Sequence, residues 1–208
     1  MDEVESKKKH WETVYKTKKL EEVSWYQPVP VTSLDFIKAA AVSTKASIID
    51  IGGGDSFLVD NLLSQGYTNI TVLDISATAI ERAKTRLGQK SDEVTWILSD
   101  ITSFEPEEKY DIWHDRAALH FLTSVREIDK YKQILENSIA ADGKVIIGTF
   151  SENGPTKCSG IEIKQYSQRE LSQFLSANFL TVECQNVDHS TPFKTSQSFI
   201  FCYFQKIK

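Results

Sequence analysis

Short apolar segments alternate with amphipathic segments through the middle of the chain, and this alternation restricts the possible folds more than any other feature. The apolar segments lack strict polar alternation, which is typical of strands buried on both faces of a sheet. The segments between them repeat apolar residues at helical spacing. This order predicts an α/β fold, in which right-handed crossovers build a doubly wound, mostly parallel sheet. The expected strands are residues 47–51, 70–73, 94–98, 110–114 and 144–150, and the expected helices are 57–65, 76–87 and 125–142.

The C-terminal part departs from this alternation. A helical pattern over 170–177 precedes two predicted strands, 179–187 and 199–205, which are joined by polar residues around Pro192. A parallel connection needs about a dozen residues or more, usually with a helix, and no helix fits between these strands. We therefore expect an antiparallel C-terminal hairpin, which completes a seven-stranded sheet with one reversed strand near its edge.

The 208 residues fit one domain, because no linker or internal repeat divides the chain. Helical patterns over 4–19 and 32–41 flank an aromatic, proline-punctuated segment, residues 22–30. This N-terminal part either packs as a hydrophobic cover or closes as a lid over a site. The predicted single domain thus comprises a helical cover or lid (1–45), a core (46–150), and a loop, helix and closing hairpin (151–208).

Charge and hydropathy restrict the partners. The net charge of −5 argues against a nucleic-acid partner. The basic cluster at residues 7–10 lies among acidic residues and is interpreted as a solvated helix face. Apolar runs are too short to span a bilayer, and the acidic start does not resemble a signal peptide. We expect no membrane partner.

The cysteines and histidines give two further expectations. Cys158, Cys184 and Cys202 cannot all pair, and no two have CxxC spacing, so free thiols in a reducing cytoplasm are expected. The four histidines have no metal-ligand spacing, so no metal is predicted. Cys158 either borders a pocket or is a loop thiol without a partner.

A glycine-rich turn follows the first predicted strand. Asp50 ends that strand, Gly52, Gly53 and Gly54 form the turn, and Ser56 precedes the helix. Glycines allow a tight turn and close approach of a ligand to helix N–H groups. A dinucleotide-binding GxGxxG motif would need a sixth-position glycine where this chain has phenylalanine, so a nucleotide-type ligand is expected but a pyrophosphate loop is not.

Carboxylates also end the next two strands. Asp74, followed by Ile75, stands where an acidic residue accepts hydrogen bonds from ribose hydroxyls. Asp100 is expected to accept from an exocyclic amine, with Ile101 against a ring face. All three strand ends meet at the edge where doubly wound folds bind ligands.

Together these motifs resemble the class I S-adenosylmethionine (SAM)-dependent methyltransferases. The glycine motif of that family, D/E-x-G-x-G-x-G/S, matches Asp50 to Ser56, and its ribose and adenine acids match Asp74 and Asp100. The resemblance implies SAM as cofactor, a Rossmann-like sheet with a C-terminal hairpin, and a methyl acceptor. Trp25 and Tyr26 would shield the reactive sulfonium if the N-terminal segment folds over it.

The resemblance is closer to bacterial small-molecule and thiol-methyltransferase-like members. These often carry an N-terminal Trp-rich segment and a D-R-A/G-A-L stretch, which here look like Trp11, Trp25 and residues 115–119. Protein-lysine methyltransferases have a comparable stretch. The leading hypothesis is therefore methyl transfer to a small molecule. The alternatives are a protein methyltransferase, a non-catalytic SAM-binding module and a nucleotide-binding oxidoreductase, which Phe57 and the terminal hairpin disfavour.

Four polar residues at the end of the fourth predicted strand are the catalytic candidates. His114, Asp115, Arg116 and His120 would lie beside the methyl group, where any of them could orient an acceptor or remove its proton. Asp115 is the strongest candidate. His114 fits a core position equally well, and His120 fits packing better than catalysis.

Overall fold

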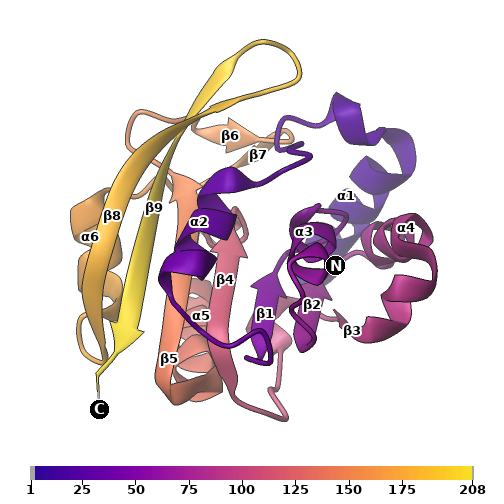
Figure 1. The fold of residues 1–208 in the computed structure, drawn as a ribbon. Coiled ribbons are helices and arrows are strands. Elements are labelled where there is room, and N and C mark those ends of the chain that lie inside the picture. Colours follow the sequence, from indigo (N-terminus) through magenta and orange to yellow (C-terminus); the bar gives the residue numbers. More distant parts are fainter. Residues whose placement is uncertain (1–2, 208) are drawn as a thin grey trace.

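A computed structural model describes residues 3–207 (Figure 1). Residues 1, 2 and 208, two of which belong to the predicted cover, lie outside this range. The strands of the main sheet are β1 (Ile48–Ile51), β2 (Ile70–Asp74), β3 (Val94–Leu98), β4 (Tyr110–Arg116), β5 (Ile139–Phe150), β8 (Phe179–Ser190) and β9 (Ser196–Lys206). The helices are α1 (Glu3–Thr17), α2 (Val31–Ala39), α3 (Leu58–Ser64), α4 (Ala77–Leu87), α5 (Val125–Ser138) and α6 (Gln168–Leu175). Within the described range, no helix is long and apolar enough to cross a membrane.

The main sheet has seven strands in the order β3-β2-β1-β4-β5-β9-β8. β1 to β5 are parallel, whereas β9 is antiparallel to both β5 and β8. The predicted doubly wound sheet with a reversed strand near its edge is confirmed, and the reversed strand is β9. A second, two-stranded sheet pairs β6 (Lys157–Cys158) with β7 (Ile161–Glu162).

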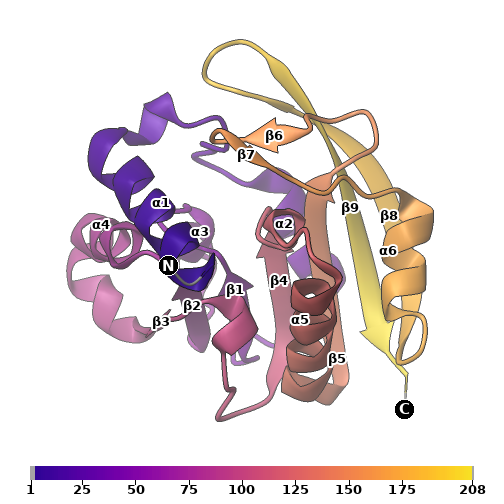
Figure 2. The same ribbon diagram turned by 180° about the vertical axis from the view of Figure 1, so that it is seen from behind.

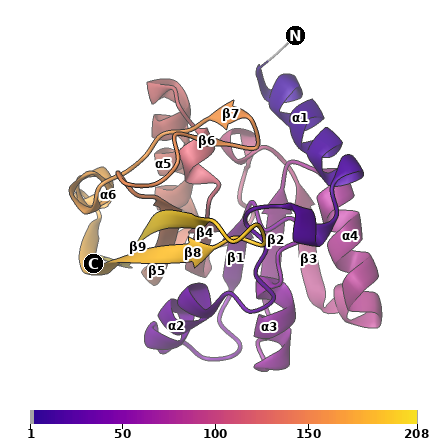
Figure 3. The same ribbon diagram turned by 90° about the horizontal axis from the view of Figure 1, so that it is seen from above.

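Successive residues of the buried strands point to opposite faces of the sheet. On β4, Ile112 packs in the core beneath α2 and α3, whereas Trp113 packs in the core beneath α5 and α6. Seen from above, the sheet lies between these two helix pairs (Figure 3). The view from behind shows α1 beside α4, and these two helices are in contact (Figure 2). This alternation decides which polar side chains of β4 reach a ligand.

The predicted boundaries before the fifth strand and within the C-terminal hairpin are wrong. The helix expected to end at residue 142 ends at Ser138, and β5 starts at Ile139, whose backbone is extended. A Cβ on Gly143 would lie 2.6 Å from Ile139 Cγ2, so glycine allows the start of β5 to pack closely. The hairpin connection is also shorter than the ten or so residues expected, because β8 continues to Ser190 and β9 begins at Ser196.

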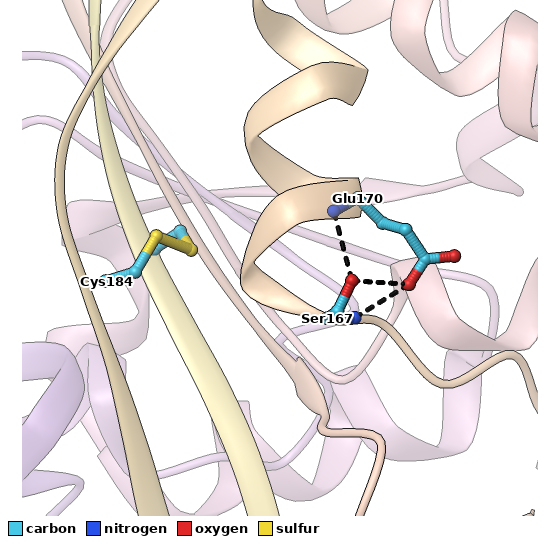
Figure 4. The surroundings of a disulfide bond; sticks show 4 residues. Ser167, Glu170 and Cys184 are labelled. Atoms are coloured by element: carbon cyan, nitrogen blue, oxygen red, sulfur yellow. Dashed lines mark hydrogen bonds between the residues drawn. A yellow bond between two sulfur atoms is a disulfide. The ribbon is translucent and has the colours of Figure 1, made fainter.

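The expectation of three free thiols is wrong. Cys184 and Cys202 form a disulfide, and Cys158 is the free cysteine. The two residues are 18 positions apart in the sequence but directly opposite in the β8–β9 register. Figure 4 shows the bond between the two strands, near the start of α6 where Ser167 and Glu170 cap the helix. The inference of a reducing compartment from unpaired thiols therefore does not hold for this pair.

Loss of this disulfide is expected to destabilise the protein. The loop that it closes spans 18 residues, for which chain entropy gives about 3 kcal/mol of unfolding free energy. Urea titration of the Cys184→Ala/Cys202→Ala variant should show that loss, and added dithiothreitol should lower the stability of the parent protein alone. Equal stability of parent and variant under oxidising conditions would contradict the prediction.

Candidate active site

One cavity lies over the carboxyl ends of β1 to β4, beneath α1 and the segment that follows it. Its empty space is about 1170 Å³ when the open mouth is included. Most predicted cofactor residues line it, namely Asp50, Gly52, Gly53, Ser56, Asp74, Ile75, Asp100, Ile101 and Trp25, whereas Gly54 and Tyr26 do not.

The turn after β1 requires its glycines. Gly52 and Gly54 have positive φ values of 65° and 47°, which favour glycine. A Cβ on Gly52 would lie 2.9 Å from Ala118 Cβ, and a Cβ on Gly53 would lie 2.6 Å from Asp50 Oδ2. Side chains at Gly52 and Gly53 would therefore collide with the protein around the turn, and the turn borders the cavity with its backbone.

Asp50 belongs to a buried polar chain. His114 Nδ1 lies 2.7 Å from Asp50 Oδ1, and His114 Nε2 lies 2.9 Å from Ser33 Oγ. All three side chains are buried, and all three residues line the cavity. His114 borders the cavity, as a role at the site requires. It is also buried with both ring nitrogens hydrogen-bonded, as a core position requires. We infer that it positions Asp50.

Two carboxylates at the ends of β2 and β3 line the cavity. Asp74 is 4% exposed, and burial raises its pKa to about 7. Ser76 N donates to Asp74 Oδ1 at 2.7 Å. Asp100 Oδ1 accepts from the backbone N and hydroxyl of Thr102 at 2.7 and 2.6 Å. Each carboxylate has a fixed orientation as a result.

Asp115, the strongest catalytic candidate from the sequence, is not among the residues that line the cavity. Its carboxylate is fully buried and accepts hydrogen bonds from Tyr131 Oη at 2.7 Å, Ala118 N at 2.8 Å and Leu119 N at 3.1 Å. Burial raises its pKa to about 6. The carboxylate thus lies on the α5 side of the sheet, where it holds the turn after β4. We reassign Asp115 from contact with an acceptor to positioning of this turn.

Arg116 and His120 do line the cavity. Arg116 Nη1 donates to the carbonyl oxygen of Trp25 at 3.1 Å. His120 is fully buried and stacks on Phe150 with a centroid distance of 4.6 Å. Cys158 also lines the cavity, which agrees with the first of its two interpretations.

The N-terminal part covers the cavity. Trp11, Tyr15 and Trp25 line it, and the Trp11 and Trp25 rings lie 5.9 Å apart, whereas Tyr26 packs on Phe57 instead. Sequence reasoning missed Tyr15, although its i, i+4 spacing from Trp11 places both on one helix face.

Polar contacts hold this cover on the core. Glu12 accepts hydrogen bonds from Ser76 Oγ and Thr78 N at the start of α4. Arg82 donates to the carbonyl oxygen of Tyr15 at 2.9 Å. From the hairpin, His189 Nε2 donates to Ser24 O at 2.6 Å. These hydrogen bonds therefore attach the cover to α4 on one side of the molecule and to the C-terminal hairpin on the other.

Several known proteins are similar in sequence. Residues 34–158 match the family model of nodulation protein S, NodS. Nodulation protein S of Bradyrhizobium diazoefficiens is 28% identical over 104 residues, which cover 50% of this chain and 49% of that protein. Malonyl-[acyl-carrier protein] O-methyltransferase 2 of Ilyobacter polytropus is 25% identical over 108 residues, 51% of this chain and 40% of that protein. The chain thus spans less than half the length of these relatives.

Solved structures share the whole fold. A methyltransferase from Burkholderia thailandensis, bound to 1,6-didemethyltoxoflavin and S-adenosylhomocysteine, has a TM-score of 0.69 at 18% identity, covering 98% of this chain and 85% of that one. NodS of Bradyrhizobium japonicum, bound to S-adenosylhomocysteine, has a TM-score of 0.66 at 15% identity, covering 86% and 87%. Since the NodS model matches more than half of the chain, the protein belongs to the NodS family, within the class I SAM-dependent methyltransferase superfamily.

Proposed function

We propose that the protein is a SAM-dependent methyltransferase that acts on a small-molecule acceptor. One observation carries the proposal: a single cavity joins the glycine turn and the carboxylates of Asp74 and Asp100 to a second, aromatic half. The first half has the features that an adenosyl cofactor needs, and the second half, lined by residues such as Arg116, His120 and Phe199, would receive the acceptor. The family and the shared fold support the same activity.

The residues of the first half fit SAM. Asp74 would accept hydrogen bonds from the ribose hydroxyls, and Asp100 with Ile101 would hold the adenine. Gly52 and Gly53, which border the cavity beside Asp50, would contact the methionine portion.

The chain's own residues then orient the reactants. When bound, SAM supplies a methyl group to which the acceptor's lone pair forms a bond, while the electron pair of the broken carbon–sulfur bond stays on sulfur. Holding the two reactants in line lowers the barrier by several kcal/mol. Trp11, Tyr15 and Trp25 exclude water above the site, and their ring faces attract a cation such as a sulfonium. This role requires no covalent nucleophile from the protein.

A protein acceptor is the second candidate. The eEF1A lysine and N-terminal methyltransferase of Mus musculus is 24% identical over 140 residues, which cover 66% of this chain and 19% of that protein. The cover formed by α1 and the segment around Trp25 favours a small molecule instead, because it restricts access to the acceptor half.

Two measurements test the proposal. Calorimetric titration should show S-adenosylhomocysteine (SAH) binding at least a hundredfold tighter than NAD; binding of NAD without SAH would overturn it. Incubation with methyl-labelled SAM and cell extract should then label the small-molecule fraction. Label confined to the protein fraction would favour the second candidate.

A further inference from the structure

Arg116, a half-buried cation that lines the cavity, lacks a full set of partners among the described residues. Arg116 Nη1 donates to Trp25 O, but the buried Nη2 has no hydrogen-bond partner among the described residues. The carboxylate of Asp50, which acts on Arg116 electrostatically, is hydrogen-bonded to His114. A buried N–H group without a partner is destabilising, and more so when it is charged. Arg116 therefore offers a strong donor to a ligand in this cavity.

His120 provides a second buried polar group in the same half. Its exposed fraction is 0%, and neither ring nitrogen has a hydrogen-bond partner among residues 3–207. Burial, and then the charge of Arg116, lower its pKa to about 3, so the ring is neutral. A neutral imidazole offers one N–H donor and one acceptor nitrogen.

The walls around these two groups are flat and apolar. His120 stacks on Phe150 with an angle of 10° between the rings, and its centroid lies 4.4 Å from that of Phe121. Arg116 Cζ lies 5.6 Å from the centroid of Phe199. Aromatic walls of this kind favour a planar ligand, because offset and edge-to-face ring contacts stabilise it.

The sheet order separates this subsite from the proposed cofactor half. Arg116 ends β4, and the rings that Arg116 and His120 contact, Phe199 and Phe150, belong to β9 and β5. Asp74 ends β2 and Asp100 follows β3, on the opposite side of β1. A ligand held by Arg116 and His120 would thus occupy the acceptor position.

We propose that the acceptor is a planar anion whose oxyanion group, of the carboxylate class, binds Arg116 Nη2 and the N–H of His120. The proposal rests on the proposed function, since it assigns the acceptor of the same site. A carboxylate fits because charge-assisted hydrogen bonds from a guanidinium to an oxyanion are roughly twice as strong as neutral ones. Ligand binding would give Arg116 Nη2 the partner that residues 3–207 do not supply.

A matched pair of probes tests this assignment. 2-Naphthoate and its neutral analogue 2-naphthamide are titrated by calorimetry into the SAH-saturated protein. We expect 2-naphthoate to bind at least tenfold more tightly than 2-naphthamide. Arg116→Met should abolish that preference and change SAH affinity by less than threefold, whereas Arg116→Lys should retain part of it.

The exposed Arg126 on α5 supplies the control, because Arg126→Met removes the same charge outside the cavity and should keep the full preference. Equal binding of the two probes, or no binding of 2-naphthoate to protein that binds SAH, would overturn the assignment. A loss of SAH affinity above tenfold in Arg116→Met, with the preference retained, would assign Arg116 to the cofactor instead. Failure of SAH to bind the parent protein would count against the proposed function itself.

Discussion

Asp74→Ala is expected to weaken SAH binding by at least tenfold. The carboxylate ends β2 inside the cavity, is 4% exposed and is oriented by Ser76 N. Ribose hydroxyls that lose this acceptor lose charge-assisted hydrogen bonds, each worth about 1.5–3 kcal/mol. Calorimetric titration measures the change, and Asp92→Ala, an exposed carboxylate after α4, is the matched control. Unchanged affinity in Asp74→Ala would remove its role at the ribose.

The same residue gives a pH signature. Hydroxyl donors bind the ionised carboxylate, and burial raises the pKa of Asp74 to about 7 in the ligand-free protein. Affinity should therefore be complete above pH 7 and fall as pH decreases, by about tenfold between pH 8 and pH 6. Asp74→Asn should lack this part of the dependence. A parent protein and variant with the same pH profile would contradict the assignment.

Asp115→Ala should lower the free energy of unfolding by about 3 kcal/mol, because it leaves buried donors without an acceptor. The donors are Tyr131 Oη, Ala118 N and Leu119 N. The effect should extend to SAH affinity, since the freed turn contacts the glycine loop where Ala118 meets Gly52. A purely catalytic residue would instead reduce turnover with stability and SAH affinity unchanged.

Urea titration measures the stability change. Asp115→Asn keeps one acceptor oxygen and should lose less, and the exposed Asp129→Ala on α5 is the control for removal of a carboxylate. An unfolding free energy of Asp115→Ala within 0.5 kcal/mol of the parent, the usual range for surface substitutions, would show that the buried hydrogen bonds contribute little.

Local signals explain why the fold and the cofactor half could be predicted from the sequence. Helical and strand periodicity depend on near neighbours, so the order of elements and the reversed strand β9 were predictable. The glycine turn follows β1, Asp74 ends β2 and Asp100 lies just after β3, and the carboxyl ends of parallel strands meet at one edge. Residue type and place in the chain were therefore enough to bring these groups together.

Long-range placement explains what could not be predicted. Asp115 and Arg116 are neighbours in the sequence, yet only Arg116 lines the cavity. Side chains alternate across a strand, and which set faces a ligand depends on how the sheet packs between its helices. The burial of His120, whose ring nitrogens have no hydrogen-bond partner among the described residues, also depends on this packing.

The sequence by itself determined the element order, the glycine turn and the carboxylates of the cofactor half. Only the tertiary structure decided the pairing of Cys184 with Cys202, the cover over the cavity and the side of β4 that meets an acceptor. The physical reason is the distance along the chain over which each signal acts. Periodicity and turn chemistry depend on residues that are only a few positions apart. Strand register and the packing of α1 bring together groups that are distant in the chain.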